Sequence, residues 1–89
     1  MKPLRYQTSF AKDLKKIVKR NYDLRKLEAT IIALRTDEPL AMTMHPHRLK
    51  GEWSGWWECH IAPDWLLIYK NEKAEVLLAR TGTHADLFE

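Results

Sequence analysis

The chain has 89 residues, of which 45% are hydrophobic and 30% are charged. This size and composition suit one globular domain, residues 1–89, with one modest core. No apolar run approaches the roughly 20 residues of a membrane-spanning helix, and the first residues lack the apolar stretch of a signal peptide. We therefore expect a cytoplasmic protein with no membrane partner. The single cysteine, Cys59, excludes an internal disulfide and a cysteine zinc cluster.

The net charge of +3 hides an uneven distribution of charged residues. Residues 1–35 carry ten Lys or Arg against three acids, whereas residues 36–89 carry five bases against nine acids. A strongly basic segment attracts polyanions at long range, so nucleic acid or an acidic protein is the natural partner. The alternative is that these bases form only a solvated helical face.

Residues 4–8 alternate weakly between apolar and polar and predict a short first strand, with Thr8 or Ser9 available to cap the helix that follows. Apolar residues at helical spacing then predict two helices, one ending near residue 20 and one running from its N-cap, Asp23, to Arg35. The outer face of the first helix carries Lys12, Lys15, Lys16 and Lys19.

The pattern changes after Arg35, where residues 36–39 stop the helix and residues 39–46 read as a loop. Residues 56–61, 65–70 and 75–80 predict three strands joined by short turns, with Glu58 and His60 on the same face. The order predicts an α+β fold in which an N-terminal strand and a two-helix hairpin pack on one face of a small antiparallel sheet. We expect the opposite face to be left for function.

Titratable residues gather at the predicted strand ends and in the C-terminal segment. Arg80 and His84 flank Gly82 after the last strand, and His60 and Asp64 flank the turn between two strands. Histidine gives or takes a proton near neutral pH, and the arginine fork suits a phosphate. Each residue also has an ordinary interpretation: a solvated tail histidine, a sheet-surface histidine, a turn-capping aspartate or an ion-paired arginine.

Three motifs in this order resemble the YafQ branch of the RelE-type toxins of bacterial toxin–antitoxin systems, and the resemblance covers essentially the whole chain. They are His47-x-Leu49-x-Gly51-x-Trp53, Glu58-Cys59-His60-Ile61-x-Pro63-Asp64-Trp65-Leu66-Leu67-Ile68-Tyr69, and Arg80-Thr81-Gly82-Thr83-His84-Ala85-x-Leu87-Phe88. The resemblance implies a RelE-like fold and a ribosome-dependent endoribonuclease that cuts mRNA, with a cognate antitoxin protein that blocks it and no cofactor.

The resemblance also implies roles for particular residues. It makes His84 the leading proton-transfer residue and Arg80 the phosphate contact, and Phe88 becomes the aromatic residue that supports the site. It assigns further functional positions to His47, His60 and Asp64, and Glu58 stands where some relatives have aspartate. We place Lys50 and Trp65 beside these residues as substrate contacts or supports, and we expect the four lysines of the first helix to contact the RNA backbone.

The implied chemistry needs no metal. A base removes the proton of a 2′-hydroxyl, the resulting oxygen attacks the adjacent phosphorus, and an acid protonates the leaving 5′-oxygen. A cation such as Arg80 stabilises the charge that develops on the phosphate. Which histidine serves as base and which as acid stays open. Packing is the alternative role for the tryptophans, and for Phe88 we favour packing that holds the tail down over direct participation. His45 is left out of the site.

Three other functions are compatible with parts of this sequence. A toxin of the same fold that acts on another target, such as gyrase, would not need the set of histidines. A non-catalytic RNA-binding domain would need only the basic helices. A zinc site built from the histidines and acids would lack the usual paired ligand spacing.

Overall fold

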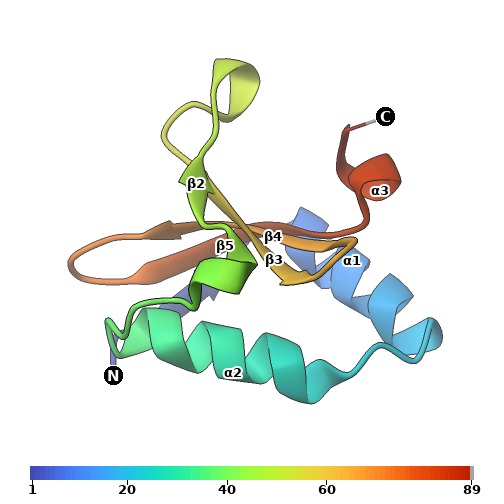
Figure 1. Ribbon diagram of the computed structural model, residues 1–89, viewed down its shortest axis with the longest axis horizontal. Coiled ribbons are helices and arrows are strands. Elements are labelled where there is room, and N and C mark those ends of the chain that lie inside the picture. The colour runs from blue at the N-terminus through green and yellow to red at the C-terminus, as the bar shows by residue number, and fades with distance from the viewer. Residues whose placement is uncertain (89) are drawn as a thin grey trace.

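The computed structural model describes residues 1–88, and its elements follow the expected order of strand, helix, helix and meander, with a short helix at the end (Figure 1). The helices are α1 (Thr8–Lys19), α2 (Leu24–Arg35) and α3 (His84–Phe88), with two 3₁₀ helices, η1 (Met42–Met44) and η2 (Gly51–Trp53). The strands are β1 (Leu4–Tyr6), β2 (His47–Arg48), β3 (Trp57–Ala62), β4 (Trp65–Asn71) and β5 (Val76–Gly82). No helix within residues 1–88 combines the length and the apolar character needed to cross a membrane.

The five strands form one sheet in the order β1-β5-β4-β3-β2. The predicted meander is confirmed, because β3, β4 and β5 pair antiparallel, and β2 extends it from a segment in which we expected no strand. The expectation of a purely antiparallel sheet is wrong at one edge, since β1 pairs parallel with β5. Along the chain, the two-helix hairpin follows β1 and precedes the meander. It allows the first and last strands to run side by side in the same direction.

Local sequence signals determine where the helices begin and end. Asp23 caps α2 as expected, because its side chain accepts the backbone N–H of Arg25. The expected cap of α1 is wrong: Gln7 occupies the N-cap position without a side-chain hydrogen bond, and the Ser9 hydroxyl donates instead to the carbonyl of Ala79 at 2.8 Å. Asn21, in the left-handed conformation at φ 59°, turns the chain from α1 towards α2.

Apolar side chains cover both faces of the sheet. On one face, α1 and α2 contribute Phe10, Ile17, Leu27 and Leu34 to the main core, together with residues of β3, β4 and β5. On the other face, a smaller cluster joins Leu66, Ile68 and Ala79 to Leu87 of α3, with Leu49, Trp53 and Trp56 packed against it. Figure 1 shows α2 beneath the sheet, with the β2–η2 excursion and α3 rising on the opposite side. Our expectation that this second face is left free is therefore wrong in part.

An ion pair between the buried Asp13 and the partly buried Arg80 joins α1 to the end of β5. Arg80 donates from Nε to Asp13 Oδ2 at 2.7 Å and from Nη2 to Asp13 Oδ1 at 3.2 Å. The same Asp13 Oδ2 accepts the backbone N–H of Thr81 at 3.1 Å. Asp13 is buried, so it needs these partners to compensate for its lost hydration. From the sequence we counted Asp13 only as one of the three acids of residues 1–35.

A second network fixes the start of α3. The backbone N–H of Thr83 donates to Asp86 Oδ2 at 2.9 Å, and the Asp86 N–H donates to Thr83 Oγ1 at 3.1 Å, which is a reciprocal capping arrangement. Arg20 of α1 donates to both carboxylate oxygens of Asp86, at 2.7 and 3.2 Å. Gly82, at φ 152°, leaves room for this carboxylate, because a Cβ there would lie 2.8 Å from Asp86 Oδ2.

Replacement of Asp13 tests the first network. We expect Asp13→Ala to lower the free energy of unfolding by about 3 kcal/mol, because it leaves the Arg80 guanidinium and the Thr81 N–H without their partner. Denaturant unfolding measures this difference. Lys12→Ala, an exposed neighbour on the same helix, is the matched control and should change stability little. Equal stability of wild type and Asp13→Ala would contradict the structural role of the pair.

The pH dependence of stability tests the second network. The hydrogen bond from Arg20, followed by that from the Thr83 N–H, lowers the pKa of Asp86. A carboxyl with a lowered folded-state pKa stabilises the fold above its unfolded value of about 3.9, and this contribution is lost as the pH falls further. We expect Asp86→Asn to lower Tm by a few degrees near pH 7. The difference from wild type should shrink below about pH 4; a constant difference down to about pH 2 would contradict this assignment.

Candidate active site

His84 is held by Asp64 at the start of α3. Asp64 Oδ1 accepts two hydrogen bonds from His84, one from the ring nitrogen Nδ1 at 2.8 Å and one from the backbone N–H at 3.1 Å. These bonds, the side-chain bond first, lower the pKa of Asp64, so the carboxylate is charged and acts as an acceptor. The hydrogen of the neutral ring is therefore on Nδ1, which leaves Nε2 for proton transfer. The turn aspartate thus orients a histidine 20 residues away in sequence.

A second carboxylate faces His47 and His60. In the β2–β3 register His47 lies opposite Glu58, and the buried Glu58 Oε1 lies 3.4 Å from His47 Nε2 and 4.0 Å from His60 Nε2. This geometry agrees with the predicted common face of Glu58 and His60. The Nδ1 of His47 lies 2.8 Å from the carbonyl oxygen of His45. Because a carbonyl only accepts, Nδ1 carries the hydrogen, and Nε2 is the nitrogen that faces Glu58.

Three imidazole rings form a row across this part of the molecule. The ring centroids of His60 and His84 are 5.8 Å apart, and those of His45 and His60 are also 5.8 Å apart. The structure therefore brings together His47, Glu58, His60, Asp64 and His84, and it adds His45, which we left out. The position of the His45 ring depends on the turn after η1. The sequence indicated this turn only through the closely spaced His45-Pro46-His47.

Arg80 is less available than the sequence suggested. Its side chain is 24% exposed, and two of its guanidinium nitrogens are bound to Asp13. Nη2 also donates to the carbonyl of Asp86 at 3.3 Å. Within residues 1–88, Nη1 is the guanidinium nitrogen that takes part in no hydrogen bond, so a phosphate contact by Arg80 would use this group.

Trp65 does not reach the surface as a substrate contact. It is 4% exposed, and its indole N–H donates to Thr81 Oγ1 at 2.9 Å. Its ring packs edge-on against Tyr22 with the centroids 4.9 Å apart. This burial leaves a base little of the ring to stack on and favours the packing alternative, in which Trp65 supports the turn that carries Asp64 from within the main core.

The last two apolar residues of α3, Leu87 and Phe88, differ in burial. Leu87 is buried against β4 and β5, whereas Phe88 is 47% exposed. The expectation that Phe88 holds the tail down is therefore wrong, because successive helical residues point about 100° apart and Leu87 takes the inner position. Phe88 is an exposed aromatic four residues after His84 in the same helix.

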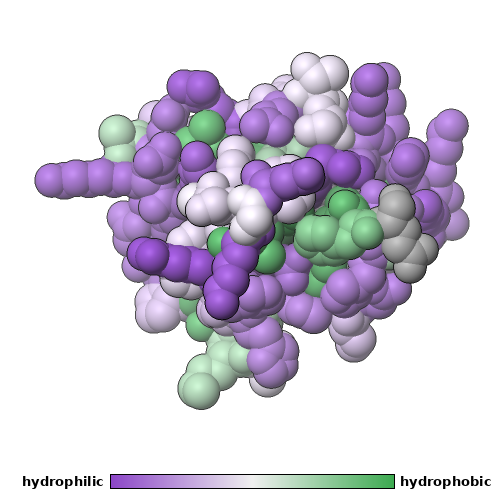
Figure 2. All heavy atoms as spheres, turned by 90° about the horizontal axis from the view of Figure 1, so that it is seen from above, coloured by the Kyte–Doolittle hydropathy of each residue, from purple (hydrophilic) through white to green (hydrophobic). Residues whose placement is uncertain are grey.

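The basic candidates lie on the surface. Lys50 is exposed just before η2, and the expected outer face of α1 is confirmed by the exposed Lys12, Lys15, Lys16 and Lys19. Figure 2, which views the side of the molecule with the β2–η2 excursion and α3, shows hydrophilic side chains around a small pale and apolar area. This surface suits a polar, charged ligand more than an apolar one.

Two hollows flank the turn that follows β3. One, of about 500 Å³, is lined by residues 43–45 and 60–63, and the other, of about 300 Å³, lies beside Asp64, Trp65 and Thr83. Among residues 1–88, no group of three His, Cys, Asp or Glu side chains is placed to hold a metal ion. The arrangement offers paired histidines and carboxylates, which suit proton transfer.

A family model and a curated relative match nearly the whole chain. The profile of the family described as "Bacterial toxin of type II toxin-antitoxin system, YafQ" matches residues 2–89. A curated relative, the "mRNA interferase toxin YafQ" of Escherichia coli strain K12, is 38% identical over 86 residues, which cover 96% of this chain and 94% of the relative.

Solved structures match over the whole fold. The structure of the Escherichia coli DinJ–YafQ complex contains a chain that is 37% identical, with a TM-score of 0.91 and coverage of 100% of both chains. A metal-bound toxin from Helicobacter pylori is 39% identical, with a TM-score of 0.91 and coverage of 99% of this chain and 100% of that chain. The resemblance seen in the three sequence motifs is confirmed: the chain belongs to the YafQ family of toxins of bacterial type II toxin–antitoxin systems.

Proposed function

We propose that the chain is an mRNA interferase, a ribosome-dependent endoribonuclease that cuts mRNA through the 2′-hydroxyl without a metal ion. The curated Escherichia coli relatives are mRNA interferase toxins. The observation that carries the mechanism is the contact of 2.8 Å between His84 Nδ1 and Asp64, beside the ring of His60. This pair turns a tail histidine into an oriented proton donor and acceptor.

His84 is the acid in the proposed reaction. Asp64 holds the ring through Nδ1 and leaves Nε2 for proton transfer, as in hydrolases that pair histidine with aspartate. Protonated Nε2 then gives its proton to the leaving 5′-oxygen as the bond between phosphorus and that oxygen breaks. The product is a 5′-hydroxyl on one fragment.

His60 is the base in the proposed reaction. Its ring neighbours that of His84 at 5.8 Å, and its Nε2 faces the buried Glu58 at 4.0 Å. It accepts the proton of the 2′-hydroxyl, whose oxygen forms a bond to phosphorus and leaves a 2′,3′-cyclic phosphate on the other fragment. Glu58 stabilises the imidazolium that results, and His47, 3.4 Å from the same carboxylate, shares this environment.

Cations complete the proposed site. Arg80, oriented by Asp13, stabilises the charge on the phosphate through Nη1. The exposed lysines of α1 contact RNA backbone of the ribosome or the mRNA, since such contacts need charge but no sequence readout. Because translating ribosomes and their mRNA are in the cytoplasm, the proposed activity is cytoplasmic. The DinJ complex of the Escherichia coli relative supports a cognate antitoxin as the inhibitory partner of this chain as well.

Substitution of the histidine–aspartate pair tests the mechanism. We expect His84→Ala to slow ribosome-dependent cleavage about 10²–10⁴-fold, because it removes one positioned proton transfer. Asp64→Asn should have a smaller effect in the same direction, because the ring keeps a neighbour but loses the carboxylate that fixes its tautomer and orientation. Primer extension on ribosome-bound mRNA measures the rates.

Two controls separate chemistry from binding. Ala85→Ser, an exposed neighbour of His84 in α3, should cleave as wild type does. Binding of His84→Ala to ribosomes should also be unchanged. If wild type and His84→Ala cleave at equal rates, a non-catalytic RNA-binding function is the better interpretation.

The salt dependence of ribosome binding tests the role of α1. Replacing Lys12, Lys15, Lys16 and Lys19 with Gln should weaken binding and reduce the steepness of its dependence on salt, by roughly 0.7–0.9 in the log–log slope for each phosphate that the variant no longer neutralises. Lys73→Gln, in the turn before β5, is the control for charge alone. An unchanged slope in the α1 variant would show that these lysines form only a solvated face.

A further inference from the structure

We propose that the hollow beside His60 is a nucleobase site, in which the ring of His45 stacks on a base next to the cleaved phosphate. The inference rests on the proposed ribonuclease function and adds a substrate subsite to it. The hollow measures about 500 Å³ and lies between η1 and the end of β3. Its two walls are residues 43–45 and residues 60–63.

The composition of the walls suits the face of a base. Met44, Ile61 and Pro63 provide apolar surface, while the Thr43 hydroxyl and the histidine rings can bond to the edge of a base. Single-stranded RNA is generally held in this manner, by stacking of splayed bases on aromatic rings and by a few hydrogen bonds.

The absence of carboxylates in its walls distinguishes this hollow from two of the others. Its walls contain no Asp or Glu, whereas Asp23 and Asp64 line the hollow across the turn, and Asp37 and Glu38 line another hollow of about 500 Å³. An anionic RNA strand is repelled by carboxylates at close range. Of these three hollows, the one beside His60 is therefore the one that suits RNA.

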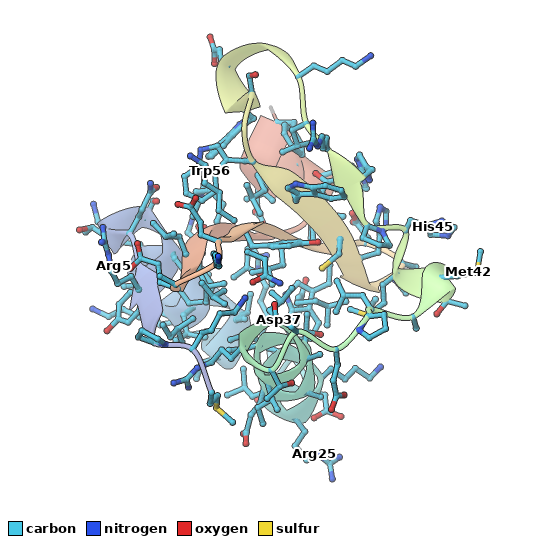
Figure 3. The ribbon with its side chains drawn as sticks, turned by 90° about the vertical axis from the view of Figure 1, so that its left-hand side faces the viewer. Arg5, Arg25, Asp37, Met42, His45 and Trp56 are labelled. Atoms are coloured by element: carbon cyan, nitrogen blue, oxygen red, sulfur yellow. The ribbon has the colours of Figure 1, made fainter. Side chains whose placement is uncertain are left out.

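His45 connects this hollow to the catalytic histidines. Its ring packs edge-on against His60, and its carbonyl oxygen accepts a hydrogen bond from Nδ1 of His47 at 2.8 Å. Its backbone is left-handed, at φ 47° and ψ 53°, directly after η1. Among residues with side chains, histidine, asparagine and aspartate are enriched in this conformation. Figure 3 shows the exposed His45 beside η1 at the edge of the molecule.

His60 belongs both to the row of imidazoles and to the wall of the hollow. A base that fills the hollow therefore places its own backbone phosphate next to His60 and His84. The subsite would give the enzyme a preference for the base at one position beside the cut, which the catalytic histidines cannot provide because they act on the sugar and the phosphate.

The test compares base preference in variants of His45. His45→Asn removes the ring but tolerates the left-handed backbone, and His45→Tyr restores an aromatic ring. Ribosomes are programmed with mRNAs that carry each of the four bases beside the cleaved bond, and kcat/KM is measured for each. We expect His45→Asn to lower kcat/KM for the preferred base about 10-fold, mainly through KM, and to flatten the preference, since one stacked base contributes about 1–3 kcal/mol.

The controls fix the interpretation. His45→Tyr should recover most of the preference. Met42, in the 3₁₀ helix η1 just before His45, is 90% exposed (Figure 3). Met42→Ala should therefore keep the wild-type profile. A preference that survives in His45→Asn overturns the proposal, whatever the overall rate.

A binding measurement separates this proposal from the proposed function. A 2′-O-methyl trinucleotide cannot be cleaved, and its binding is followed by the NMR shifts of residues 43–45 and 60–63. Shifts in these residues that disappear in His45→Asn support the subsite even if wild type proves inactive as a nuclease. Cleavage by wild type without such shifts, and with a preference unchanged in His45→Asn, rejects the subsite and leaves the nuclease function standing.

Discussion

The ion pair of Asp13 and Arg80 determines where the C-terminal segment lies. Asp13 binds two guanidinium nitrogens and the N–H of Thr81, so it fixes the end of β5 from the inner face of α1. About two turns further along, Arg20 at the C-cap of α1 holds Asp86, which in turn caps α3. The helix that presents lysines to solvent on its outer face therefore positions His84 through its inner face and its end. Removing either anchor would displace the His84 ring, which we propose as the acid, without touching it, and displacements of about 1 Å are kinetically expensive.

The site is assembled from segments that have little structure of their own. The β2–η2 excursion and α3 are short, and both are fixed to the same face of the sheet by the small cluster around Leu66, Ile68 and Leu87. The turn between β3 and β4 carries Asp64, which binds His84 at the start of α3. Because Trp65 anchors this turn in the main core and donates to Thr81, both cores contribute to one row of side chains. The apolar cover that we did not expect on this face thus holds the site in place.

Periodicity predicted most of the fold, and it failed where long-range pairing decides the outcome. The helices, the meander and the common face of Glu58 and His60 follow from repeats of 3.6 and 2 residues. The parallel partner of β1 does not, because no local pattern specifies a strand about 70 residues away. Asp13 did carry a signal, since it lies three residues after Phe10 and four before Ile17 on the apolar stripe of α1, and an acid in that position needs a buried partner. His45 had none beyond its neighbours, because a left-handed residue after a 3₁₀ helix decides where its ring lies.

An enzyme that binds a polyanion and needs carboxylates must keep those carboxylates away from the phosphates. Here each of the two carboxylates is paired with histidine. Asp64 Oδ1 accepts two hydrogen bonds from His84, and the buried Glu58 faces His47 and His60. The imidazoles of His47 and His60 therefore cover Glu58, whereas the Asp64 side chain is 63% exposed and is engaged by His84 through Oδ1. The hollow that we assign to the base lies beyond His60, on the side where no carboxylate contributes to the walls. Of the two hollows that flank the turn after β3, it is the one whose walls carry no carboxylate, and RNA in the proposed pose would lie on that side.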